Sequence, residues 1–160
     1  MKFQPATEED LILSDEEKFK QDIENSWAVE LRKDIRQEKK TKASKAKKDF
    51  DPIDFMIIKI GTDIVVGYIE LKSRTFESNK YAETMIDHHK MVAIRRKSFD
   101  SGKPIYLAIR FTDKDMVYEY NPSHRFRIEH NGRTKNTRTA YDIKEVEYIP
   151  LHCFRELKLV

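Results

Sequence analysis

Residues 54–72, DFMIIKIGTDIVVGYIELK, decide the fold because they contain two adjoining stretches typical of β-strands. The runs FMIIKI and IVVGYI are rich in β-branched residues and flank a short link that begins at Gly61, which is the pattern of a β-hairpin. Both runs are mostly apolar, so each strand is expected to be covered on both faces. Charged residues in or beside such strands are costly to bury and indicate a function. These residues are Asp54, Glu70 and Lys72.

Hairpin geometry would bring the three charged side chains together. Glu70 and Lys72 are two residues apart on one strand, so their side chains point to the same face, roughly 7 Å apart. Asp54 and Glu70 are equidistant from Thr62 in the link, so antiparallel pairing sets Asp54 opposite Glu70. Two carboxylates suit a hard cation such as Mg²⁺ or Mn²⁺, and an adjacent lysine can orient or deprotonate a metal-bound water.

The motif DPIDF followed by IELK resembles the PD-(D/E)xK nuclease superfamily, and most of all its small phage endonuclease I and Holliday-junction resolvase branch. The resemblance implies that Asp54 and Glu70 bind Mg²⁺, that the backbone carbonyl of Leu71 assists, and that Lys72 serves the attacking water. It also implies DNA as the substrate, duplex or branched. A homodimer is expected of a junction resolvase, because two cuts must be placed across one junction.

The chain departs from the family pattern at the proline. Pro52 is separated from Asp54 by Ile53, which leaves Asp51 as an alternative to Asp54; we prefer Asp54 because it adjoins the strand. The pattern D/E-x-K alone is common in a chain with 37% charged residues, but only the instance at Glu70 ends an apolar strand whose hairpin partner begins with an aspartate. The alternative interpretation is a surface salt bridge on an edge strand.

A first helix is predicted after Ser14, because Ser14 and Glu17 form a capping box. Its apolar positions Phe19 and Ile23 are four apart, and Glu16 falls on the same inward face. Nucleases of this branch often carry a glutamate on the helix before the sheet, so the resemblance implies that Glu16 completes the metal site. The alternative is a first-turn acid favoured by the helix dipole.

The stretch 32–48 carries nine basic residues against two acidic ones and almost no apolar side chain, which predicts a mobile loop or extended hairpin outside the core. Beside an acidic metal site, it would neutralise backbone phosphates without reading the base sequence. The alternative is a solvated run of charge. The residues predicted to contact nucleic acid are Lys39, Lys40, Lys42, Lys45, Lys47, Lys48, Arg74 and Lys90.

A second helix is predicted over residues 80–98, with Gly102 marking its end. Adjacent histidines face different directions on a helix, so a metal clamp made by His88 and His89 is disfavoured. The resemblance implies a polar residue of this helix near the scissile phosphate, and Lys90 or His89 would suit. The alternative is that these are polar residues at the rim of the helix.

The order of predicted elements indicates an α+β domain of three layers with a mixed central sheet, an αβββαβ core like that of restriction endonucleases. The core covers about 14–120, and residues 121–160 are a C-terminal decoration with a second basic surface over 121–140. All 160 residues are expected to form one domain. The predicted elements are a helix over 14–26, strands over 27–32, 55–60 and 64–69, the helix over 80–98, a buried strand over 104–111, a more exposed edge strand over 116–120, a short strand over 146–149 and a terminal helical turn over 150–159.

Composition limits the kinds of protein that this chain could be. Lys and Arg number 31 against 28 Asp and Glu, so the net charge of +3 alone does not indicate nucleic-acid binding. Cys153 is the sole cysteine, which excludes an internal disulfide or a Cys/His zinc motif. No apolar run could span a membrane and the N-terminus is unlike a signal peptide, so a soluble cytoplasmic protein is expected, in a phage-infected host if the resemblance holds.

These observations together predict a Mg²⁺-dependent endonuclease that hydrolyses phosphodiester bonds, with DNA as the expected substrate. One alternative is a nucleic-acid-binding protein with the nuclease fold but without turnover. Another is an intracellular structural protein with a charged surface, which would have no salt-sensitive affinity for DNA.

Overall fold

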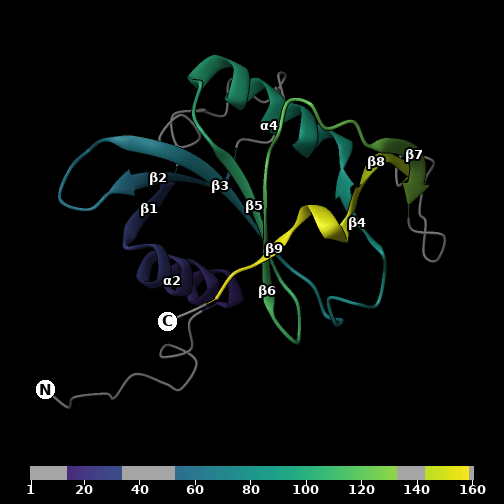
Figure 1. Cartoon of the computed structure of the whole chain (residues 1–160), viewed down its shortest axis with the longest axis horizontal. Helices are drawn as coiled ribbons and strands as arrows, with labels where there is room; N and C mark the ends of the chain where they lie inside the picture. The colour runs from purple at the N-terminus through teal and green to yellow at the C-terminus, as the bar shows by residue number, and fades with distance from the viewer. Residues whose placement is uncertain (1–13, 34–52, 133–142, 159–160) are drawn as a thin grey trace, which may run out of the picture.

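The computed structural model describes residues 14–33, 53–132 and 143–158. Two α-helices lie on opposite faces of a six-stranded sheet, which gives three layers (Figure 1). In chain order the elements are α2 (Asp15–Trp27), β1 (Val29–Lys33), β2 (Phe55–Lys59), β3 (Val65–Ser73), β4 (Glu83–Asp87), α4 (His88–Ser101), β5 (Ile105–Arg110), β6 (Asp115–Glu119), β7 (Arg127–Gly132), β8 (Ile143–Pro150), the 3₁₀ turn η3 (Leu151–Cys153) and β9 (Arg155–Glu156).

The main sheet has the strand order β1-β2-β3-β5-β6-β9. β3 and β5 are parallel, whereas all the other neighbours in this sheet are antiparallel. The predicted α+β class with a mixed sheet, which is consistent with a core like that of restriction endonucleases, is therefore confirmed.

Each face of the main sheet packs against one helix. Phe19 and Ile23 of α2 pack against Ile69 and Leu71 of β3 and form one apolar cluster. The other cluster packs α4 against the opposite face, and its α4 and β5 members are Met91, Ile94, Ile105, Leu107 and Ile109. The site described below lies on the face that α4 covers.

The β2–β3 hairpin forms as predicted, although its turn is one residue out of step with its open end. At the open end Phe55 pairs with Ile69. The turn is closed by the N–H of Lys59, which donates to the carbonyl of Ile64 at 3.0 Å. A β-bulge absorbs the difference, because Ile57 pairs with Gly67 and Ile58 with Val65, which leaves Val66 of β3 as the extra residue. The pairing predicted for the functional end of the hairpin is thereby kept.

The first helix begins where the sequence predicts. The hydroxyl of Ser14 accepts the N–H of Glu17 at 3.1 Å, which satisfies one of the free amides of the first turn. The helix ends at Trp27, and Ala28 adopts the left-handed conformation with φ of 53°.

The predicted helix over 80–98 is wrong in its first part. Burial alternates along β4, and β4 pairs with β8 in antiparallel fashion, so this long-range pairing overrides the helical pattern. The helix begins only after Asp87, whose carboxylate accepts the N–H of His89 at 3.0 Å. Its end agrees with the prediction, because Gly102 caps it in the left-handed conformation with φ of 64°.

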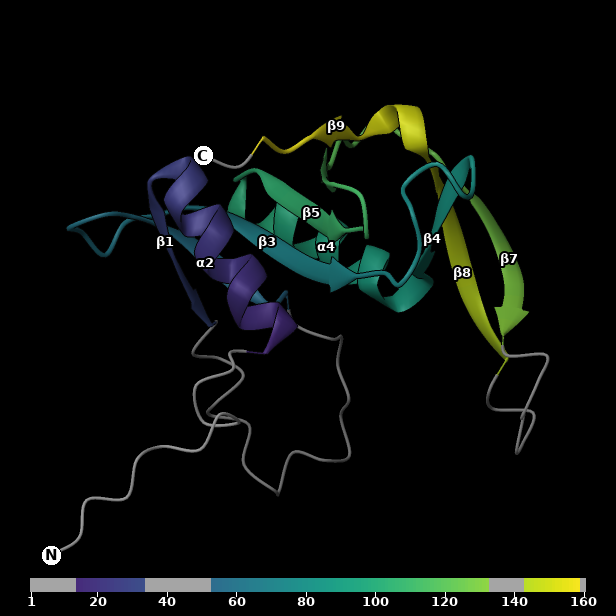
Figure 2. The same ribbon diagram turned by 90° about the horizontal axis from the view of Figure 1, so that it is seen from below.

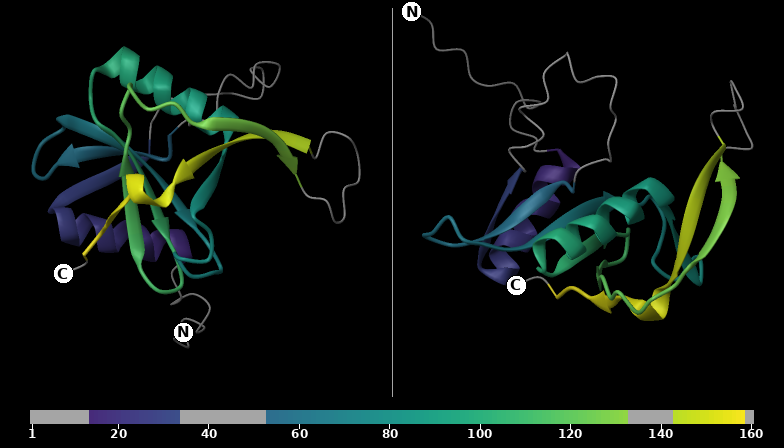
Figure 3. Two further views of the ribbon diagram at one scale, coloured as in Figure 1. Left: turned by 45° about the vertical axis from the view of Figure 1, so that its right-hand side comes forward. Right: turned by 90° about the horizontal axis from the view of Figure 1, so that it is seen from above.

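β4, β8 and β7 form a separate three-stranded sheet in that order. This second sheet lies at the end of the molecule opposite to the turn of the β2–β3 hairpin (Figure 2), and both views of Figure 3 show β7 and β8 extending away from the main sheet. The predicted strand over 146–149 is part of β8. The segment predicted as decoration therefore builds a sheet together with a strand from the predicted core.

The prediction of an exposed edge strand over 116–120 is wrong. β6 is buried at every position except Glu119, because Met116 and Tyr118 pack in the cluster on one face of the sheet and Val117 in the cluster on the other. β9 pairs with its outer edge. The predicted terminal helical turn over 150–159 is reduced to η3, although Phe154 and Leu157 are buried as the pattern indicates. Within the described ranges, no helix is long and apolar enough to cross a membrane.

Candidate active site at the β2–β3 hairpin

The alternation of side chains along β3 directs Glu70 and Lys72 towards α4. In the parallel register with β5, Glu70 pairs with Leu107 and Lys72 pairs with Ile109. Both partners belong to the apolar cluster that contains Met91 of α4. Glu70 and Lys72 therefore share one face of the sheet, as the spacing of two residues predicts.

Two hydrogen bonds across the hairpin hold the carboxylates of Asp54 and Glu70. The backbone N–H of Asp54 donates to Oε2 of Glu70 at 3.0 Å. The backbone N–H of Leu71 donates to Oδ2 of Asp54, also at 3.0 Å. The carboxylate of Glu70 is thus bonded to the backbone of Asp54, and the carboxylate of Asp54 to the backbone of Leu71, the residue after Glu70. These bonds fix both side chains at the same end of the hairpin.

Glu70 is a buried carboxylate with a lysine partner from the helix. Its side chain and that of Lys90 are almost fully buried, and Nζ of Lys90 lies 2.9 Å from Oε1 of Glu70. Burial, and then the negative charge of Asp54, raise the pKa of Glu70 to about 7, although Lys90 acts in the opposite direction. Asp54 and Glu70 are therefore close enough to influence each other electrostatically.

The two lysines of the site differ in their partners. Lys72 is half-buried and forms no ion pair with another residue of the described part of the chain. Lys90 was predicted to contact nucleic acid, but its amine is buried and bonded to Glu70. The pairing of Lys90 with Glu70 was not predicted. The one available signal was the phase of Lys90 with buried Ala93 on the helix.

The structure does not bring Glu16 to the other two acids. Glu16 is exposed, so the expectation that it points inward with Phe19 and Ile23 is wrong. It lies on α2, which packs against the face of the sheet opposite to that of Glu70. Over the described ranges, no three His, Cys, Asp or Glu side chains gather into a group that could hold a metal ion. A role of Glu16 in binding metal stays a prediction.

Arg74 lies at the start of the segment that connects β3 to β4. Its guanidinium is half-buried and donates to the carbonyl of Met85 at 3.1 Å, and burial lowers its pKa. Its role in binding nucleic acid stays a prediction. The other residues predicted to bind nucleic acid, and the alternative acid Asp51, lie outside the described residues; the former are Lys39, Lys40, Lys42, Lys45, Lys47 and Lys48.

A second buried carboxylate, Glu147 of β8, was missed by the sequence reasoning. It is fully buried and bonds to both terminal nitrogens of Arg95, while Nδ1 of His88 lies 2.7 Å from its Oε2. Burial alone would raise the pKa of Glu147, but the hydrogen bonds with Arg95 and His88 outweigh burial and lower it. This network attaches α4, the helix that carries Lys90, to the second sheet. A signal was present, because glutamates interrupt the apolar pattern of IKEVEYIP.

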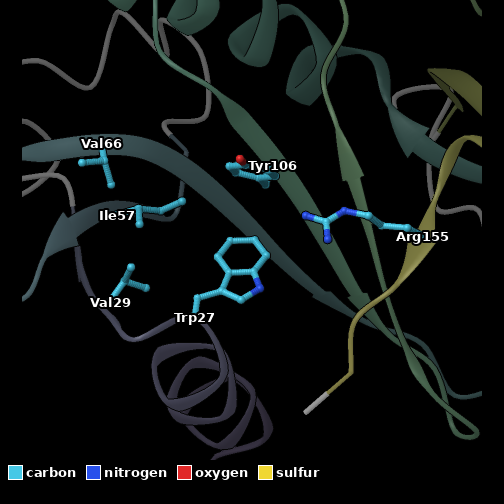
Figure 4. A pocket seen from close by; sticks show the side chains of 6 residues that line it. All are labelled: Trp27, Val29, Ile57, Val66, Tyr106 and Arg155. Carbon is cyan, nitrogen blue, oxygen red and sulfur yellow. The ribbon is translucent and has the colours of Figure 1, made fainter. Parts of the chain in front are cut away.

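A hollow of about 360 Å³ lies apart from these residues (Figure 4). Val29 and Ile57, which line it, pack on the side of the sheet that α2 covers. None of the residues predicted for catalysis or binding lines it. Its lining consists of Trp27, Val29, Ile57, Val66, Tyr106 and Arg155.

Comparison with known protein families identifies a family for this chain. A sequence model of the family described as "Phage putative PDDEXK endonuclease" matches residues 2–157. No curated protein sequence matches the chain. The match covers the hairpin, both helices and the second sheet.

Proposed function

Because the chain belongs to the phage PDDEXK endonuclease family, we propose that it is a metal-dependent endonuclease that cleaves DNA with Asp54, Glu70 and Lys72. The observation that carries this proposal is the pair of hydrogen bonds that holds the carboxylates of Asp54 and Glu70 at one end of the hairpin. Lys72 shares a face with Glu70, which places it on the side of the sheet where a reaction at these acids would occur.

The donor atoms of the site fit a hard divalent cation. Asp54 and Glu70 supply carboxylate oxygens, and Leu71, between Glu70 and Lys72, offers a backbone carbonyl. The charge of Asp54 raises the pKa of Glu70, so two ionised carboxylates repel each other here. A divalent cation would relieve that repulsion. Mg²⁺ commonly uses one or two protein carboxylates and keeps several waters, so a third acid is not required.

The residues have separate roles in the proposed reaction. Asp54 and Glu70 would hold a Mg²⁺ or Mn²⁺ ion, which when bound polarises the scissile phosphate and lowers the pKa of a water. Lys72 would position the attacking water and stabilise the negative charge that develops at the phosphate. The hydrogen bonds from the backbone of Asp54 and Leu71 keep both carboxylates oriented, which reduces the reorganisation needed during the reaction.

The test is cleavage of plasmid and of a four-way junction with Mg²⁺, with Mn²⁺ and with a chelator. We expect Asp54→Asn and Glu70→Gln to lower the cleavage rate by at least about a hundredfold, the scale on which single preorganised groups act. Binding to the same DNA should be unchanged or tighter, because a negative charge near the phosphates is removed. Asp100→Asn, an exposed acid near the end of α4, is the matched control and should cut normally.

A Glu70→Gln enzyme that cuts at the wild-type rate would refute the assignment. Wild-type protein that binds DNA but never cuts it, with either metal, would instead favour the silent nucleic-acid-binding protein. Comparing duplex with junction, together with the mass in solution, tests the two finer proposals, a preference for branched DNA and a homodimer.

A further inference from the structure

Both oxygens of the Glu70 carboxylate are already engaged. Oε2 accepts the N–H of Asp54 at 3.0 Å, and Oε1 lies 2.9 Å from the ammonium of Lys90. The bond to Asp54 lies within the β2–β3 hairpin, so it is kept as long as the two strands stay paired. The bond to Lys90 comes from a different layer of the fold, because Lys90 lies on α4.

Lys90 offsets one of the two negative charges that Asp54 and Glu70 carry when both are ionised. Its ammonium contacts the carboxylate of Glu70 directly. The exposed fraction of the Glu70 side chain is 4% and that of the Lys90 side chain is 11%, so water screens their attraction poorly. A divalent cation held by the same carboxylate would lie close to the ammonium, and two cations at short range in a poorly screened site would repel each other.

We propose that Lys90 is a resident counter-cation, which neutralises Glu70 in the metal-free protein and must leave its oxygen when a divalent ion binds. This inference rests on the proposed function, because it concerns the same metal site. Lys90 is then a positioning residue, whose amine and the metal compete for one carboxylate. Lys90 keeps Glu70 ordered without metal. Because its amine must be displaced before the metal binds, the apparent affinity for the metal is weaker.

The experiment measures Mn²⁺ binding without nucleic acid, by titration calorimetry on chelator-treated protein. Lys90→Met removes the charge and keeps an apolar stem of similar length, and Lys90→Gln keeps an amide that can donate to Glu70. Lys97→Met is the matched control, since it removes the same charge two turns further along α4, where Lys97 lies 4.7 Å from the ring of Tyr68. Glu70→Gln identifies binding at the site.

We expect Lys90→Met and Lys90→Gln to bind Mn²⁺ at least about tenfold more tightly than wild type, in line with usual coupling between competing ligands. Lys97→Met should bind as wild type does. A second readout is the urea midpoint. Without metal it should fall in Lys90→Met, because Glu70 loses its partner, and saturating Mn²⁺ should raise it more in this variant than in wild type.

Two outcomes would overturn the inference, and they differ in what they say of the proposed function. If wild type binds Mn²⁺ through Glu70 and cuts DNA but neither Lys90 variant binds more tightly, Lys90 does not compete and only this inference is lost. If wild type binds no Mn²⁺ that depends on Glu70, both proposals are lost. If Lys90→Met does not fold, Lys90→Gln decides between them.

Discussion

Glu70 is the residue on which the site depends, and its surroundings are only partly visible in the sequence. The adjacency of Asp54 and Glu70 follows from local rules, because a short link sets the register of a hairpin. The contact between Lys90 and Glu70 depends on how α4 lies across the sheet, which no local pattern encodes. Glu16 was placed wrongly because helical phase does not tell where the covering sheet ends.

The raised pKa of Glu70 predicts how stability depends on pH. The pKa is about 7 in the folded protein and 4.5 ordinarily, so the folded state holds more protons between these values. The free energy of unfolding of metal-free protein should therefore fall by roughly 3 kcal/mol from this group as pH rises from about 4.5 to 7. Glu70→Gln should remove this part of the slope, as measured by urea unfolding at pH 5 and pH 7.5.

The comparison between wild type and variant isolates the contribution of Glu70 from that of all other groups. Asp100→Asn serves as the control and should keep the wild-type slope, because Asp100 is exposed near the end of α4. Identical slopes for wild type and Glu70→Gln would show that folding does not raise the pKa of this carboxyl group.

Among the elements, the strands and helices with a clear local pattern agree with the prediction, whereas β4 and the covered edge of β6 are determined by pairing with distant strands and differ from it. The hairpin and the start of α2 follow from turn and capping chemistry. The local pattern predicts a helix at β4, because its partner β8 lies about sixty residues further along the chain. The pattern predicts an edge strand at β6, because the two residues of β9 give no strand signal of their own.

The network around Glu147 predicts that α4 and the second sheet depend on each other. Glu147→Ala would leave Arg95 and His88 without their buried partner, which should cost about 3 kcal/mol of unfolding free energy. Glu145→Ala on the same strand should cost less than about 1 kcal/mol, because its contacts with His88 and His130 are at the surface. Urea unfolding followed by circular dichroism measures both, and equal losses would contradict the structural role assigned to Glu147.

For the whole molecule, the sequence predicts the layers of helix, sheet and helix, but it does not predict the second sheet. Alternating helical and strand patterns predicted a sheet between two helices, and this arrangement is present. The sequence predicts residues 121–160 as a C-terminal decoration of the core, and in the structure β8 from this segment pairs along the full length of β4. The predicted strand over 146–149 lies within β8, whereas its pairing with β4 and the bonds between its buried Glu147 and Arg95 of α4 were not predicted.

The basic stretch 32–48 predicts a salt-dependent affinity for DNA. Replacing Lys39, Lys40 and Lys42 with Gln should flatten the slope of log K against log salt by about 3, if each contacts one phosphate. The same change at exposed Lys59, Lys114 and Lys158 is the control and should leave the slope as it is. Fluorescence anisotropy of a labelled duplex between 50 and 200 mM salt, with chelator present, gives the slope. Equal slopes for all three proteins would place the DNA elsewhere.

Strand β3 carries core residues on one face and the charged residues of the hairpin on the other. Ile69 and Leu71 face α2, while Glu70 bonds to a lysine of α4. Losing or gaining one residue between Gly67 and Glu70, without a further bulge to absorb it, would exchange the two faces, so that carboxylate and amine would enter one hydrophobic layer and aliphatic groups would replace them in the other. Related chains should therefore vary in length on either side of this part of the strand but not inside it.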